Sequence, residues 1–178
     1  MKIFPEFFLG GFPPKILCSP TSAYERMRDK YDDDVLIFGY SEMDKLDFYS
    51  SALIVDGDSH YSTRKTEPWG KEEKKVYKPS PKIPKVFSTS IGNLLVLLCN
   101  DAFEVKFGQV AYSKQLWQKD KIDLIVVLSH WQNGIDEFLV KRGILRLSKG
   151  TECNKWILCD TFNGYRDSGN INFKYSFL

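Results

Sequence analysis

The sequence lacks the features that tie a chain to a membrane, to nucleic acid or to a metal. No run approaches the roughly 18 consecutive apolar residues that a membrane-spanning helix needs. The formal net charge of +2 at pH 7 is too small to indicate nucleic acid or an anionic membrane as partner. The four cysteines form no CxxC pair and no metal-ligand spacing with the two histidines. Pro5 and Glu6 interrupt the amino terminus, which therefore does not have the layout of a signal peptide.

We therefore expect a cytoplasmic protein with reduced cysteines, no metal and no membrane or nucleic-acid partner. Its 178 residues, 43% hydrophobic and 27% charged, match ordinary globular proteins and suffice for one sizeable core. The sequence has no internal repeat and no low-complexity tail. We expect a single domain over residues 1–178.

The hydrophobic pattern predicts short strands that alternate with helices. A very short strand at Ile3 and Phe4 leads into a Gly-rich turn, and Ser19 is a plausible cap for a helix over 20–30. Further strands are expected at 35–40, 49–55, 60–65, 86–88, 94–98, 122–129 and 155–161, a helix at 136–147, an ambiguous helix at 106–119 and an irregular loop at 68–84. The predicted strands alternate with helices, and hairpins occur between them. The predicted class is therefore α/β with a mixed sheet.

Three chemically useful side chains follow predicted strands. Cys99 comes directly after the buried strand 94–98, and open α/β sheets place reactive groups at such carboxyl ends. Glu6 and Lys65 stand at similar junctions between a strand and a loop. A nucleophile, a base and a cation are sufficient for acyl transfer through a thioester. Taken singly, each also has an ordinary structural interpretation: a core thiol, a turn acid and a solvated lysine.

Taken together, these segments resemble the nitrilase, or carbon–nitrogen hydrolase, superfamily. Residues 4–11 (FPEFFLGG), 61–69 (YSTRKTEPW) and 97–101 (LLCND) are similar to its three signature segments and occur in its order. The intervening stretches 37–42 (IFGYSE), 51–55 (SALIV) and 123–129 (DLIVVLS) are also similar.

The resemblance implies a four-layer α-β-β-α sandwich that pairs sheet to sheet in a dimer. It also implies a hydrolase of amide or nitrile C–N bonds that needs no cofactor. Glu6 would be the general base, Lys65 the cation that stabilises the oxyanion and Cys99 the nucleophile. Glu73 would be the second glutamate of the family, although Glu72 is adjacent. The pair Pro68-Trp69 is similar to amidase members.

The proposed chemistry requires these residue types. A thiol with a pKa of about 8.5 is mostly protonated at neutral pH, so a carboxylate must accept its proton or a cation must favour the thiolate. The charge that develops on the substrate would be stabilised by Lys65 and the amide of Asn100. His130 and Trp131 would follow the strand 122–129 and line the acyl pocket, and Trp69 is a further candidate substrate contact.

Several alternatives remain open at this stage. His130 could activate Cys99 as a dyad, and Phe7, Phe8 and Phe12 are more typical of a core than of a substrate pocket. The run 71–75 that contains Glu73 is also typical of a solvated charged face. A nucleic-acid binder that uses the basic stretch 71–85 has only its charge in its favour.

The sequence departs from the resembled family at both ends. Family members have a full strand and helix before the glutamate segment, whereas this chain begins four residues before Pro5; the closing hairpin after Asn163 and Gly164 is also short. Leu95 stands where the family often has glycine. Either the start codon is set too far downstream, or this is a shortened relative that exposes a sheet edge, is less stable and self-associates. A shortened relative could also be an inactive scaffold or binding protein.

Overall fold

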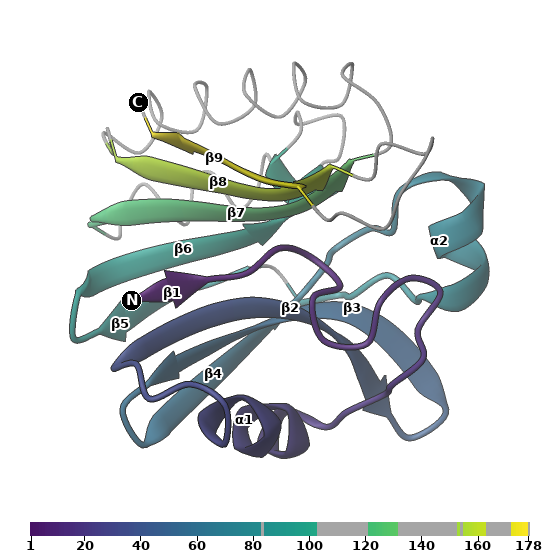
Figure 1. Cartoon of the computed structure of the whole chain (residues 1–178). Coiled ribbons are helices and arrows are strands. Elements are labelled where there is room, and N and C mark those ends of the chain that lie inside the picture. The colour runs from purple at the N-terminus through teal and green to yellow at the C-terminus, as the bar shows by residue number, and fades with distance from the viewer. Residues whose placement is uncertain (83, 103–120, 132–152, 154, 163–171, 178) are drawn as a thin grey trace.

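Two β-sheets packed face to face form the frame of the computed structural model (Figure 1). It describes residues 1–82, 84–102, 121–131, 153, 155–162 and 172–177. The first sheet has the order β1 (Lys2–Ile3), β2 (Val35–Asp44), β3 (Asp47–Asp56), β4 (Ser59–Arg64). The second has the order β5 (Val86–Thr89), β6 (Gly92–Leu98), β7 (Leu124–Trp131), β8 (Trp156–Phe162), β9 (Asn172–Phe177). The described helices are α1 (Pro20–Arg28), α2 (Gly70–Val76) and the 3₁₀ turn η1 (Cys99–Ala102).

Both sheets are mixed, which confirms the predicted α/β class. In the first sheet β1 runs parallel to β2, and the hairpins β2–β3 and β3–β4 are antiparallel. In the second, β6, β7 and β8 are parallel, while β5 and β9 pair antiparallel at its edges. The sequence pattern did not predict β9, and it ended β2 at Tyr40, four residues too early. Because parallel neighbours end at one edge of a sheet, the carboxyl ends of β6 and β7 lie together.

Three hydrophobic clusters hold the layers together. The cluster between the sheets includes Ile37, Ile54, Val96 and Val126. A second cluster packs Ala23 and Met27 of α1 against the outer face of the first sheet, and a third lies on the outer face of the second sheet. Alternate residues of β7 belong to the inner and the outer cluster of its sheet, so its continuous apolar run is buried on both faces.

The helix after Ser19 begins as predicted. The Ser19 hydroxyl accepts a hydrogen bond from the Ser22 N–H at 3.2 Å, and Pro20 occupies the first turn, where it costs no backbone hydrogen bond. Arg26 and Arg28 lie in the last turn, where positive charge stabilises the helix.

The prediction of an irregular loop over 68–84 was wrong, because this segment contains α2. The helix has no buried residue, so it shows none of the apolar periodicity from which a helix is recognised. Its charges are arranged to stabilise it instead. Glu72 and Glu73 lie in the first turn, Lys74 and Lys75 lie in the last, and Glu72 pairs with Lys75 at 2.7 Å.

Some predicted features fall beyond the described residues. They are the helices expected at 106–119 and 136–147 and the loop at Asn163 and Gly164. Within the described part, α1 and the two sheets account for three layers of the expected sandwich. No helix in that part has the length and apolar character needed to cross a membrane. All four cysteines are buried and free of disulfides.

Gly39 lets the amino-terminal segment lie directly against β2. The Gly39 N–H donates to the Pro5 carbonyl at 3.2 Å, and the Leu9 N–H donates to the Gly39 carbonyl at 3.0 Å. A Cβ at position 39 would lie 2.5 Å from the Glu6 Cα and 2.8 Å from the Phe7 nitrogen. Only glycine allows this approach, and the turn carrying Glu6 is thereby seated on the sheet.

We expect Gly39→Ala to destabilise the fold by about 3 kcal/mol, near the upper end of the overpacking range, because its methyl group collides with backbone. Gly57→Ala is the control. Its Cβ meets no atom within 4 Å, although a φ of 57° imposes about 1 kcal/mol of strain. Urea unfolding of both variants measures the difference. An equal or smaller loss in Gly39→Ala would contradict the proposed close approach.

Candidate active site

Four of the predicted site residues meet where the two sheets end. Glu6 lies in the turn after β1, and Lys65 follows β4 directly, both on the first sheet. Cys99 follows β6 of the second sheet as the first residue of η1, and Glu73 is supplied by α2. The predicted positions of Glu6, Lys65 and Cys99 at strand ends are confirmed.

Lys65 is the centre of the cluster. Its side chain is 1% exposed, and its Nζ lies 2.9 Å from Glu6 Oε1, 3.1 Å from Glu73 Oε1 and 2.9 Å from Glu73 Oε2. Its backbone is also held, because the Lys65 N–H donates to the Ser50 carbonyl at 2.8 Å. A buried ammonium is tolerated only with such partners, and the two carboxylates raise the pKa of Lys65 well above its usual value despite burial. The lysine is therefore a fixed positive charge.

Glu73, and not Glu72, is the second glutamate of this cluster. Glu72 is exposed and paired with Lys75, whereas the Glu73 carboxylate reaches Lys65. The backbone N–H of Trp69, which precedes α2, donates to Glu73 Oε2 at 2.6 Å. The run 71–75 thus has two functions: most of its charges are solvated, and one enters the site.

Glu6 is a buried carboxyl group that titrates near neutral pH. Its side chain is 1% exposed, and Oε1 accepts hydrogen bonds from the Ser50 hydroxyl at 2.7 Å and from Lys65. Burial raises the pKa of Glu6, Lys65 lowers it and Glu73 raises it, and the net result is a pKa of about 7. Among the described residues Oε2 has no hydrogen-bond partner. One oxygen of the carboxylate is therefore available to accept a proton near neutral pH.

Cys99 is buried beside these charges. Burial raises the pKa of its thiol to about 12, Lys65 lowers it, and Glu6 and Glu73 raise it. The thiol is consequently protonated at neutral pH and needs a base to become a nucleophile. Ser129 of β7 also lowers this pKa, although its hydroxyl makes no hydrogen bond of normal geometry within the described structure.

The backbone at Cys99 is strained. Its φ of 38° lies in the left-handed region, which a residue with a Cβ rarely adopts. The strain occurs at the sharp turn from β6 into η1, and strained residues of this kind cluster at active sites, where the surrounding structure holds them in place.

Thr66 and Asp101 join the two loops that carry Lys65 and Cys99. Asp101 is buried, and its Oδ1 accepts hydrogen bonds from the backbone N–H of Thr66 at 3.0 Å and from the Thr66 hydroxyl. Burial raises the pKa of Asp101 to about 6, and its Oδ2 has no partner among the described residues. Thr66 and Asp101 were not among the residues predicted for the site. Their positions were the only signal in the sequence: Thr66 follows Lys65 directly, and Asp101 comes two residues after Cys99.

Aromatic rings line one side of the site. Phe7 stacks on Tyr77 with ring centroids 5.5 Å apart and meets His130 edge-on at 5.7 Å. The Tyr77 hydroxyl and the Ser41 hydroxyl lie 2.7 Å apart. Burial lowers the pKa of His130, while Glu73 raises it and Lys65 lowers it, so His130 lies within electrostatic reach of the cluster. Phe7 is buried, as predicted for a core residue, and it also forms this wall.

The remaining predicted contacts are less central. Trp69 is 45% exposed, and it holds Glu73 through its backbone. Asn100 lies in η1 and Trp131 ends β7, but the side chains of both fall beyond the described part of the structure. In that described part, no group of three or more metal-binding side chains is present.

Comparisons with known proteins agree with this geometry at the level of fold. No protein-family model matches the sequence, and no curated protein matches it. Among solved structures, the chain is similar to a nitrilase-superfamily amidase from Nesterenkonia AN1, with a TM-score of 0.64, 18% identity and coverage of 89% of this chain and 61% of the amidase. It is also similar to a glutamine-dependent NAD⁺ synthetase from Acinetobacter baumannii, with a TM-score of 0.68, 22% identity and coverage of 98% and 34%.

A carbon–nitrogen hydrolase from Helicobacter pylori G27 matches with a TM-score of 0.50, 18% identity and coverage of 71% of this chain and 45% of that one. The chain spans about three fifths of the length of the Nesterenkonia amidase. Identities this low establish the architecture and leave the activity to be argued from the side chains. The chain has the fold of the nitrilase superfamily.

Proposed function

We propose that the protein hydrolyses a non-peptide C–N bond, in an amide or a nitrile, through a thioester on Cys99. The observation that supports this proposal best is the buried Lys65 ammonium, held between Glu6 and Glu73 beside the thiol. The fold similarity to amidases agrees with it. One Nesterenkonia amidase variant carries the acetamide moiety of fluoroacetamide on its active-site cysteine.

In the first step, Glu6 accepts the proton of the Cys99 thiol as the sulfur attacks the carbonyl carbon of an amide. A C–S bond forms, and the carbonyl π electrons move to oxygen. The Lys65 ammonium stabilises this oxyanion, together with the backbone N–H of Asn100. Because the ammonium is already fixed by two carboxylates, it needs no reorganisation when the charge develops.

In the second step, protonated Glu6 donates its proton to the leaving nitrogen and the C–N bond breaks, which releases ammonia or an amine. Glu6 then accepts a proton from water as the water oxygen attacks the thioester. The C–S bond breaks, Glu6 returns its proton to the leaving sulfur, and the carboxylic acid and the free thiol are formed. A base that alternates between these tasks works best with a pKa near the working pH, as that of Glu6 is.

Glu73 acts on both Lys65 and Glu6. Its carboxylate orients the Lys65 ammonium through two contacts, and its negative charge raises the pKa of Glu6. Without that charge Glu6 would be a weaker base. The aromatic wall of Phe7, Tyr77 and His130 favours a substrate whose acyl group is apolar.

A panel of small aliphatic and aromatic primary amides and nitriles tests the activity by ammonia release. We expect Cys99→Ala to abolish turnover and Glu6→Gln to reduce it by at least about 100-fold, the usual contribution of a general base. Glu72→Gln is the matched control for Glu73→Gln, because Glu72 points away from the site and its loss should leave turnover unchanged. No turnover of any member, with equal alkylation of all four cysteines in the folded protein, would favour the inactive scaffold.

The pH dependence of Cys99 alkylation by iodoacetamide tests the role of Glu6. With Glu6 as base, the rate should fall about tenfold per pH unit below about 7 and level off above it, because Glu6 is protonated on the acid side. An unassisted thiol would react faster with each unit up to its own pKa of about 12. In Glu73→Gln the bend should move to lower pH, since a charge that raises the pKa of Glu6 is lost. A profile without a bend near neutrality would contradict the assignment.

Thr66→Val tests the connection between the two loops. The change removes the hydroxyl bound to Asp101 while keeping the side-chain shape, and it should cost about 1–3 kcal/mol of stability because a buried carboxylate loses a donor. We also expect slower turnover at unchanged KM, since Lys65 and Cys99 lose their fixed spacing. Thr63→Val on β4 is the control for stability and kinetics. Matched kinetics in the two valine variants would restrict Thr66 to a structural role.

A further inference from the structure

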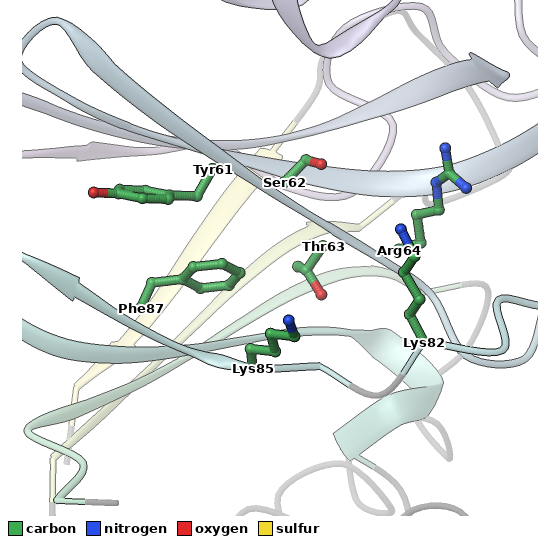
Figure 2. A pocket seen from close by; sticks show the side chains of 7 residues that line it. All are labelled: Tyr61, Ser62, Thr63, Arg64, Lys82, Lys85 and Phe87. Atoms are coloured by element: carbon green, nitrogen blue, oxygen red, sulfur yellow. The ribbon is translucent and has the colours of Figure 1, made fainter.

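A cavity lies away from the cysteine site, between the edge strand β4 of one sheet and β5 of the other. It has a volume of about 330 Å³ and is lined by residues 61–64 of β4 together with Lys82, Lys85 and Phe87 (Figure 2). None of the residues Glu6, Lys65, Glu73 and Cys99 contributes to its wall. The volume is at the lower end of the roughly 300–1,000 Å³ typical of small-molecule sites, so it suits a ligand with one ring and one charged group.

The cavity has an apolar end and a cationic end. The rings of Tyr61 and Phe87 lie side by side with centroids 5.5 Å apart and form the apolar end. Figure 2 shows Arg64 and Lys82 at the opposite end, with Lys85 and the Thr63 hydroxyl between the two. A molecule that lies along the cavity would therefore contact aromatic surface first and positive charge next.

Sheet edges add hydrogen-bonding capacity. Among the described strands, β4 is the edge of the first sheet and β5 is the edge of the second. An edge strand presents one row of backbone N–H and C=O groups that no neighbouring strand pairs. Backbone donors of β4 can therefore supplement the hydroxyl groups of Ser62 and Thr63.

The charges around the cavity leave two cations without an ion-pair partner. Arg64 is paired with Glu42 at 2.5 Å and with Asp44 at 2.8 Å. Neither Lys82 nor Lys85 has a carboxylate within ion-pair distance in the described structure. Three cations thus face two carboxylates, both of which are bound to Arg64, and the excess positive charge belongs to the two lysines.

We propose that this cavity binds a small aromatic anion, a ring carrying a carboxylate or a phosphate. The ring lies against Tyr61 and Phe87, and the anionic group accepts hydrogen bonds from Lys85 and Thr63. Charge-assisted hydrogen bonds of this kind are about twice as strong as neutral ones, and the rings remove the apolar part of the ligand from water. Binding at this site requires no reaction at Cys99.

Phenyl phosphate is the probe, titrated into the isotope-labelled protein and followed by two-dimensional NMR. We expect saturable shifts confined to residues 61–64 and 82–87. Inorganic phosphate and phenol should each bind at least about tenfold more weakly, because inorganic phosphate lacks the aromatic ring and phenol lacks the anionic group. Benzoate should bind at the same residues, and its affinity relative to phenyl phosphate distinguishes a carboxylate site from a phosphate site.

Lys85→Ala should weaken phenyl phosphate binding at least about tenfold, and Lys82→Ala by less, because Lys82 lies at the end of the cavity away from the two rings (Figure 2). Both lysines are exposed, so neither change endangers folding. Lys78→Ala removes another exposed lysine outside the cavity and should leave binding unchanged. Equal affinity in the wild type and Lys85→Ala, an equal loss in Lys78→Ala, or shifts scattered over the surface would overturn the proposal.

Discussion

The arrangement of the site depends on one buried cation. The Lys65 ammonium is removed from water and compensated by two carboxylates, so the cluster contains more negative than positive charge. Burial favours a proton on Glu6, and the second negative charge, on Glu73, adds to this effect, so the pKa of Glu6 lies near neutrality although Lys65 lowers it. The same ammonium lowers the pKa of the nearby thiol. One fixed lysine therefore influences the protonation of both Glu6 and Cys99.

The position of Lys65 is fixed by the residue before it as well as by its own contacts. Arg64 forms a two-point contact with Glu42, which also accepts hydrogen bonds from the hydroxyl groups of Tyr40 and Ser51. These residues come from three adjacent strands of the first sheet. Because successive residues of a strand point to opposite faces, anchoring Arg64 on one face helps direct the chain that continues into Lys65. A network outside the site thus supports it.

Much of this arrangement could be predicted from sequence because its parts obey local rules. A reactive residue after an apolar run marks a strand end, and that rule located Cys99. Glu6 and Lys65 were noticed at junctions between a strand and a loop, and the resemblance of their short motifs to a known family gave them their predicted roles. The run 41–44 was not predicted to be strand, because it is polar apart from Met43; the pairing of Glu42 with Arg64 explains why such residues are tolerated there.

The features that were not predicted from the sequence depend on contacts between residues that are far apart in the chain. The helix α2 buries no residue, so no periodic pattern marks it, and its value to the site is the one carboxylate it directs to Lys65. Thr66 and Asp101 are unremarkable polar residues until the fold brings their loops together. Ser50 and Ser129 likewise become relevant only when their strands are packed against the loops that carry Glu6 and Cys99.

The division of the cluster between the two sheets has a consequence for folding. The acid and the amine belong to one layer and the sulfur to the other, and the inter-sheet cluster of hydrophobic residues brings the layers together. An intermediate with only one finished layer would therefore leave the acid and amine apart from the thiol. The pKa of the Cys99 thiol would then fall toward its ordinary value, because the burial that raises it is lost, so the titration of this one thiol reports whether the two layers have assembled.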